Sequence, residues 1–238
     1  MLQLKCAIVS PNYDQREPGS RIEYIILHYT ACDFDLSVDV LTDAKSNNPV
    51  SAHYLIDEQG EVFQLVPDAM RAWHAGVSAW RNRQGLNTWS LGIEMVHPGH
   101  GPFAQPQLRS CLKLCQVLMQ KYAIPPKNIL GHSDIAPTRK ADPGEYFDWQ
   151  GFAEHGVGIY PNEIDISSLK VASSRVNNVA YVQELLKSVG YEITCDGVLG
   201  KQTKAVITAF QRHFYPQKID GEMDGQGLAR LLLISQLV

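Results

Sequence analysis

Three residues of this chain have the types and positions expected of ligands to a catalytic metal ion. His28 lies near the end of the apolar run IILHYT, His132 ends the run ILGH, and Asp142 precedes a proline in RKADPG. Two imidazoles and one carboxylate form a zinc set that leaves a fourth position for water, which is how catalytic rather than structural zinc is bound. We therefore predict a site for one Zn²⁺ per chain.

The setting of these residues separates them from ordinary histidines and aspartates. His28 and His132 each close a predicted buried strand, and open α/β sheets place their ligand crevice at strand ends. Pro143 biases Asp142 toward an extended backbone. In an extended segment residues i and i+2 project from the same side, so the Lys140 ammonium group is expected beside the Asp142 carboxylate.

Glu94 is a carboxylate within the apolar strand sequence SLGIEMV, where an unpaired charge is costly. One interpretation is a buried salt bridge. The other is a general base beside metal-bound water, with its pKa tuned by burial and by the cation. Lys140 would then stabilise a developing oxyanion. Together these groups predict hydrolysis of an amide.

Composition excludes several other classes of function. The formal net charge of −4 and the pI of about 6.0 give no basic footprint, so we expect no nucleic-acid partner. No stretch approaches the roughly 18 apolar residues of a transmembrane segment. The N-terminal sequence MLQLKCAIVS lacks the long apolar region of a secretory signal. The expectation is either a protein that stays in the cytosol or one whose export signal is absent or unconventional, and no protein partner is identified.

The elements that must position these residues follow from hydrophobic periodicity. Apolar runs predict buried strands, helical spacing predicts amphipathic helices, and alternation around EQG predicts a hairpin. The strands are expected at 22–29, 89–96 and just before His132, the hairpin at 51–66, and the helices at 35–45 and 106–122. Strands interleaved with helices predict an α/β sheet covered on both faces.

The composition and hydrophobic pattern of the sequence change after Pro161. Residues 162–175 are polar and weakly patterned, which is typical of a linker. Three amphipathic helices are expected beyond it, each separated from the next by an Asp-Gly turn. We therefore predict a catalytic domain at 1–161 and a small three-helix domain at 176–238.

Six motifs are spread over residues 21–161, namely IILHYTA, NNPVSAHYLID, AWHAGVSAW, LNTWSLGIEM, GHSDIAPTRKADPG and FDWQGFAEHGVGIYP. Together they resemble the zinc-dependent N-acetylmuramoyl-L-alanine amidases of the AmpD/AmiD type, and most closely the two-domain AmiD members. Asp142 distinguishes the chain from related peptidoglycan-recognition proteins, which commonly carry Cys there. The segments GYEITCDGVLGKQTKAVITAFQ and IDGEMDG are similar to the peptidoglycan-binding domain found beside many wall hydrolases.

The resemblance implies a mixed central β-sheet flanked by helices, and cleavage between N-acetylmuramic acid, or its anhydro form, and L-alanine. It implies that zinc is held by the three ligands named above, that Glu94 is the catalytic acid/base and that Lys140 assists the transition state. Peptidoglycan or muropeptides are the expected partners. Substrate contacts are expected from Tyr29, Thr30, Trp73 and His74.

Three alternatives remain open from the sequence. A non-catalytic peptidoglycan-recognition module would not require Glu94, and a zinc endopeptidase is disfavoured because no HExxH pattern is present. His97 and His100 in HPGH form either a second metal site or a solvated loop, and the loop is favoured. His53 is expected to be a hydrogen-bonded structural histidine.

Overall fold

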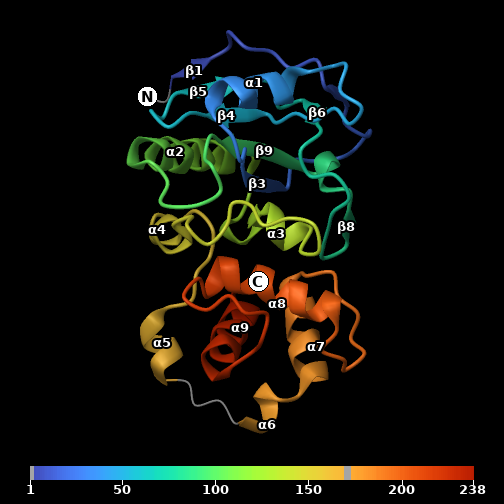
Figure 1. The fold of residues 1–238 in the computed structure, drawn as a ribbon, viewed down its shortest axis with the longest axis vertical. Helices are drawn as coiled ribbons and strands as arrows, with labels where there is room; N and C mark the ends of the chain where they lie inside the picture. Colours follow the sequence, from blue (N-terminus) through green and yellow to red (C-terminus); the bar gives the residue numbers. More distant parts are fainter. Residues whose placement is uncertain (1–2, 169–172) are drawn as a thin grey trace.

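The structure of this chain is a computed structural model that describes residues 3–168 and 173–238. A sheet-containing unit stacks on a smaller helical unit, which holds the C-terminus (Figure 1). Among the described residues, no helix combines the length and apolar character needed to cross a membrane.

A six-stranded mixed sheet forms the centre of the larger unit. Its strand order is β1-β5-β4-β9-β3-β10. β4, β9, β3 and β10 run parallel, whereas β5 is antiparallel to β4. The strands are β1 (Leu4–Lys5), β3 (Tyr24–Tyr29), β4 (Tyr54–Ile56), β5 (Val62–Gln64), β9 (Ser90–Met95) and β10 (Ile129–Gly131). The predicted mixed sheet and its hairpin are confirmed.

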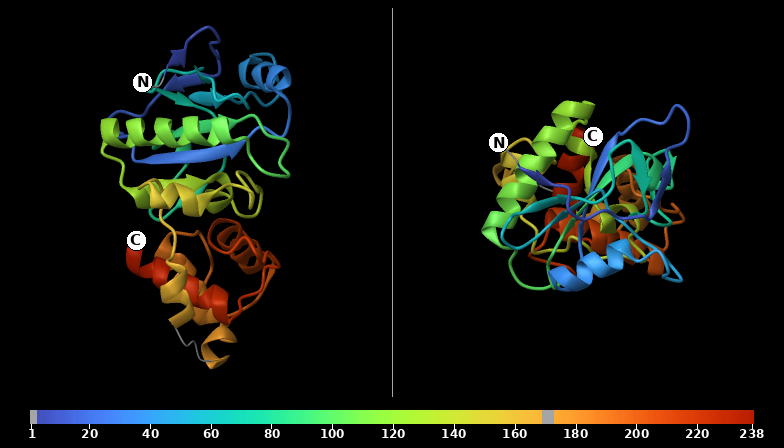
Figure 2. Two further views of the ribbon diagram at one scale, coloured as in Figure 1. Left: turned by 90° about the vertical axis from the view of Figure 1, so that its left-hand side faces the viewer. Right: turned by 90° about the horizontal axis from the view of Figure 1, so that it is seen from above.

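Helices cover the sheet, and Figure 2 shows α2, in green, running alongside it. Asp33 begins α1 because its side chain accepts a hydrogen bond from the Leu36 N–H, as an N-cap should. Buried apolar residues at helical spacing, Cys111 and Cys115 among them, hold α2 against the sheet. The helices of this unit are α1 (Phe34–Thr42), α2 (Gln105–Tyr122), α3 (His132–Ile135) and α4 (Trp149–Glu154).

Shorter elements complete the unit around the end of the sheet. They are the paired strands β2 (Tyr13–Gln15) and β6 (Met70–Ala72), the paired strands β7 (Ala79–Trp80) and β8 (Arg83–Gln84), and the 3₁₀ turns η1 (Leu86–Thr88) and η2 (Pro126–Asn128).

Alternation along the two central strands decides which side chains reach the site. Leu27 of β3 and Ile93 of β9 lie in the core that includes α2. Successive strand residues point to opposite faces, so His28 and Glu94 project from the other face. The register pairs the Cα atoms of His28 and Glu94. These two residues are therefore neighbours on one face of the sheet.

The helical unit differs from expectation at its start. Residues 162–175, predicted to be a linker, contain two short helices in their described part, while 169–172 lie outside the described residues. Glu163 forms an ion pair with Arg230 at 2.9 Å and Ile166 is buried, so the segment is held against the helices that follow. The helices are α5 (Glu163–Ser168), α6 (Ser173–Val176), α7 (Val179–Val189), α8 (Lys201–Phe214) and α9 (Gly225–Leu237).

The two Asp-Gly turns of this unit are built alike. The Gln183 side chain of α7 donates to Asp196 and accepts from the Gly197 N–H, at 2.9 and 2.8 Å. Gln211 of α8 makes the corresponding bonds in the second turn, at 2.9 Å each, to Asp220 and the Gly221 N–H. A buried glutamine thus fixes each turn that leads into the next helix.

Candidate active site and metal centre

His28 and Glu94 enter the site from the adjacent strands β3 and β9. The segment that carries His74 lies between these strands in sequence and packs tightly against β9. Gly92 lies two residues before Glu94 on the same face of β9, where the His74 imidazole covers it. A Cβ at position 92 would overlap the His74 ring. A glycine is needed here because another group approaches the strand backbone closely.

The other two ligands are brought together by α3 and the loop that follows it. His132 begins α3 directly after β10. The Ser133 N–H donates to the Asp142 carbonyl at 2.9 Å, so α3 also holds the loop that carries Asp142. Gly131 has no side chain to obstruct that loop, because a Cβ there would lie 2.8 Å from Pro143.

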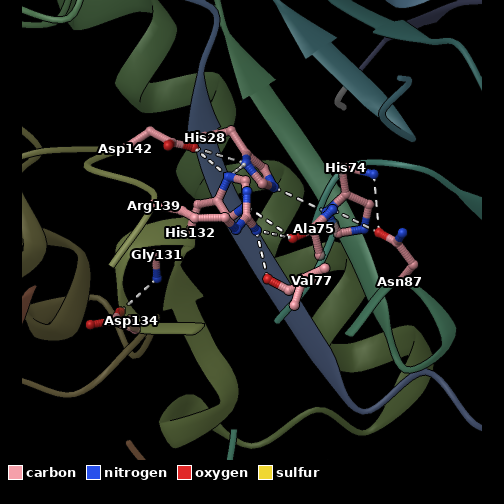
Figure 3. Close-up of polar contacts among 10 residues, drawn as sticks. All are labelled: His28, His74, Ala75, Val77, Asn87, Gly131, His132, Asp134, Arg139 and Asp142. Carbon is pink, nitrogen blue, oxygen red and sulfur yellow. Dashed lines mark hydrogen bonds and ion pairs between the residues drawn. The ribbon is translucent and has the colours of Figure 1, made fainter. Parts of the chain in front are cut away.

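The side chains of the three predicted ligands lie together in the structure (Figure 3). His28 Nδ1 lies 3.0 Å from His132 Nδ1, and both lie 2.9 Å from Asp142 Oδ2. This is the one potential metal-binding group of His, Cys, Asp and Glu among the described residues, and all three members are buried. Lone pairs repel at these separations unless a proton or a cation lies between them. The ligand spacing around tetrahedral zinc is roughly 3.4 Å, and the three separations are smaller than this by only a few tenths of an ångström. The donor set is therefore close to the size and chemistry that this ion requires.

The distal nitrogens of both histidines are fixed by one segment of chain. His28 Nε2 lies 3.0 Å from His74 Nδ1, and His132 Nε2 lies 3.1 Å from the Ala75 carbonyl. A carbonyl only accepts, so His132 carries a proton on Nε2, and the neutral ring then presents Nδ1 as a lone pair. We assign the same tautomer to His28, with His74 as the acceptor, because partners of this kind orient metal-binding histidines.

The acceptor segment is itself anchored. His74 Nε2 lies 3.2 Å from Ser90 Oγ, whose hydroxyl donates to the Leu86 carbonyl at 2.6 Å. The Asn87 side-chain oxygen accepts from the backbone N–H groups of His74 and Ala75, at 3.0 and 2.7 Å (Figure 3). The His74 ring and the backbone that holds the Ala75 carbonyl are therefore both fixed by hydrogen bonds.

Burial keeps the imidazoles of His28 and His74 neutral. It lowers the pKa of His28 to about 4, with a further lowering from His132, and it lowers the pKa of His74 well below 6.5. Neutral imidazole is the form that binds a metal ion.

Glu94 and Lys140 line one cavity of about 420 Å³ together with His132 and Asp142. Glu94 Oε2 is shielded from solvent and has no hydrogen-bond partner in the described chain. Burial, and secondarily the charge of Asp142, raise the pKa of Glu94 to about 8, while Lys140 acts in the opposite direction. A divalent cation in the site would lower that pKa again. Of the two interpretations of Glu94, the buried salt bridge finds no partner at Oε2 among the described residues, and this oxygen is free to exchange a proton.

Three of the four predicted substrate-binding residues line the cavity. Tyr29 and Thr30 line the cavity, whereas Trp73 does not appear in its described lining. His74 lines the cavity too, but both of its ring nitrogens are within hydrogen-bond distance of protein groups. Its geometry is that of a residue positioning His28.

His97 and His53 have hydrogen-bond partners within the protein. His97 accepts from the Gly99 N–H through Nδ1 and donates to the Gly101 carbonyl through Nε2, and His100 is exposed. The structure thus supports a loop rather than a second metal site there. His53 is fully buried and accepts the Gly92 N–H through Nδ1, as expected of a structural histidine.

Sequence reasoning missed Asn87, Gly92 and the positioning role of His74. A glycine inside an apolar strand was a visible sign of close approach at position 92. Asn87 gave no comparable sign, because its partners are backbone groups of a segment distant in sequence.

Comparison with known proteins agrees with this geometry. The Amidase_2 family, N-acetylmuramoyl-L-alanine amidase, matches residues 18–145, and the PG_binding_1 family of peptidoglycan binding domains matches residues 175–231. AmiD of Escherichia coli strain K12 is 37% identical over 233 residues, covering 90% of this chain and 83% of AmiD.

Two solved structures are similar over nearly the whole chain. E. coli AmiD, in complex with the substrate anhydro-N-acetylmuramic acid-L-Ala-D-gamma-Glu-L-Lys, has a TM-score of 0.83 and 34% identity, covering 94% of this chain and 93% of AmiD. AmpDh3 of Pseudomonas aeruginosa, in complex with an anhydromuramic pentapeptide, has a TM-score of 0.80 and 31% identity, covering 100% and 99%. The chain belongs to the N-acetylmuramoyl-L-alanine amidase family.

Proposed function

We propose that this protein hydrolyses the amide bond between N-acetylmuramic acid, or its anhydro form, and the L-alanine of peptidoglycan stem peptides. The observation that carries the proposal is Glu94, a carboxylate with an unpartnered oxygen in the same cavity as His132 and Asp142, two of the three convergent metal ligands. A module that only recognises peptidoglycan needs no such group. The substrates of E. coli AmiD and P. aeruginosa AmpDh3 support the choice of bond.

The metal in this proposal is one Zn²⁺ ion held by His28 Nδ1, His132 Nδ1 and Asp142 Oδ2. Zinc bound by three protein ligands supplies a Lewis acid and an open position for water. Two neutral imidazoles and one carboxylate give the site a low net negative charge, which suits a divalent cation.

The chain's own residues supply proton transfer and charge stabilisation. Glu94 accepts a proton from the attacking water and returns it to the leaving L-alanine nitrogen. Lys140 presents a positive charge to the oxyanion that develops on the lactyl carbonyl oxygen. Tyr29 and Thr30 lie at the cavity wall, where they contact the substrate. Trp73 and His74 remain predicted contacts: His74 lines the cavity with both ring nitrogens near protein groups, whereas Trp73 is not among the described lining residues.

We also propose that the catalytic domain spans 1–161 and that 176–238 is a peptidoglycan-binding helical domain. The family matches at 18–145 and 175–231 support this division.

The test is incubation of the purified protein with an anhydro-muropeptide and with intact sacculi, with and without a chelator. We expect free stem peptide beginning at L-alanine, detected by mass spectrometry, and its loss on chelation. A protein that binds the muropeptide without releasing the stem peptide would be a recognition module instead.

The Glu94→Gln variant tests the catalytic assignment, because the amide keeps the shape of the side chain and cannot act as a base. Turnover should fall by about 10²–10⁴-fold, the usual contribution of general acid–base catalysis. Zinc content measured by elemental analysis should stay at one per chain, whereas His132→Ala should lose it. Full turnover by Glu94→Gln would contradict the proposed role.

A further inference from the structure

The helical unit packs directly behind the metal centre. Ile26 and Ile135 of the sheet unit lie in one buried cluster with Leu186 of α7 and Phe210 of α8. The Arg81 N–H donates to the Gly190 carbonyl at 2.8 Å. A Cβ at Gly190 would lie 2.6 Å from the Trp80 indole, so the units approach to backbone contact.

One fully buried carboxylate joins the two units. Asp134 of α3 accepts the Gly131 N–H at 2.8 Å, within its own unit (Figure 3). It also accepts the Tyr191 hydroxyl and lies 2.8 Å from His213 Nδ1, which both belong to the helical unit. A buried carboxylate is costly unless it is fully hydrogen-bonded. Asp134 thus depends on the helical unit for two of its three partners.

Aromatic packing fixes the two donors. The Tyr191 ring packs edge-on against Trp80 at 4.9 Å between centroids. The His213 ring stacks between Trp149 and Phe214, at 3.7 and 3.8 Å. These contacts hold both rings beside Asp134.

Asp134 is linked to two metal ligands through the backbone. It lies two residues after His132 on the same short helix, and it caps that helix at Gly131. Ser133, which lies between His132 and Asp134, donates its backbone N–H to the Asp142 carbonyl. Any shift of α3 therefore moves both His132 and Asp142 relative to His28, which stands on a different strand.

We infer that Tyr191 and His213 are positioning residues, and that the helical unit holds α3 where its metal ligands meet His28. This goes beyond wall binding as a role for the unit and rests on the proposed metal site. Metal binding is measured without turnover, so a failure of the amidase proposal is distinguishable from a failure of this one.

The experiment uses the full chain with Tyr191→Phe, which removes one oxygen and keeps the ring against Trp80. His213→Phe keeps the stack and removes the donor, and His213→Asn restores a donor near Nδ1. Tyr181→Phe is the matched control, because this tyrosine of α7 lies beneath Arg175 rather than beside Asp134. Zinc affinity is measured by chelator competition, ligand geometry by the visible spectrum of the Co²⁺ form, and kcat and KM on a muropeptide.

We expect Tyr191→Phe and His213→Phe to bind zinc about tenfold more weakly, at the low end of the effect of partners behind metal ligands. The Co²⁺ spectrum should change and kcat should fall with KM unchanged, while Tyr181→Phe stays as wild type and His213→Asn recovers affinity. A lower Tm for Tyr191→Phe with wild-type zinc affinity and Co²⁺ spectrum would overturn the inference. Tyr191→Phe decides the question alone if the His213 variants do not fold.

Discussion

At the scale of single residues, the site depends on groups that never reach the metal. His28 and His132 present the correct nitrogen because His74 and the Ala75 carbonyl occupy the other one. Such partners fix both the tautomer and the orientation of the ring. His74 was predicted to contact the substrate, and the two roles have different kinetic consequences.

We expect His74→Ala to weaken zinc binding about 10–100-fold, because the His28 imidazole loses its acceptor and can rotate. His74→Asn should recover most of the affinity, since its amide oxygen can replace Nδ1. Chelator competition measures both variants, with exposed His100→Ala as the control. A raised KM with unchanged zinc affinity in His74→Ala would instead assign this residue to the substrate.

At the scale of elements, the site is set by how closely segments can approach the central strands. β9 presents Glu94 toward the cavity and a bare backbone at Gly92, so the segment carrying His74 can lie on the strand. The strand alternation that buries Ile93 on one face therefore determines the chemistry of the other face.

We expect Gly92→Ala to destabilise the protein by about 1–3 kcal/mol or more, because the new methyl group overlaps the His74 ring. Zinc affinity should fall with it, since His74 would be displaced from His28. Urea unfolding measures the stability. Gly225→Ala is the control, because a Cβ there has no neighbour within 4 Å and should be neutral or stabilising by about 0.4–1 kcal/mol. Equal stability of the two variants would contradict the close approach.

At the scale of the whole molecule, buried neutral histidines make stability depend on pH. His53 is fully buried, and burial, followed by the charge of Arg16, lowers its pKa to about 3. The unfolded chain, with the ordinary pKa of about 6.5, binds the proton first. The stability contribution is therefore complete above pH 6.5 and declines as the pH falls from 6.5 toward 3.

We expect the free energy of unfolding of the metal-free protein to decrease below pH 6.5, with His53 contributing up to about 1.4 kcal/mol per pH unit. His53→Gln has no titrating group, so its stability should depend less steeply on pH by about one proton. Urea titrations at pH 7, 6 and 5, in chelator, measure the two slopes. Identical slopes would show that His53 is protonated equally in the folded and unfolded states.

The amino-acid sequence by itself predicted the ligand types and the strands and helices that carry them, and it marked Glu94 as a carboxylate within an apolar strand. These features follow from local hydrophobic periodicity and from the residue types that zinc prefers as ligands. Both can be recognised in the sequence before the fold is known. The helices of the second unit were confirmed for the same reason. The polar segment 162–175 contains two short helices in its described part, and Glu163 ties it to Arg230, a contact between distant residues.

Only the tertiary structure determined which groups position the metal ligands. Asn87, His74 and Asp134 act through groups remote in sequence, and neither periodicity nor spacing records which backbone or side chain a polar group will meet. Two of the three partners of Asp134 come from the helical unit, which the sequence presented as a separate domain. A buried polar group must find its partners wherever the folded chain supplies them, and here that requirement joins the two units at the metal centre.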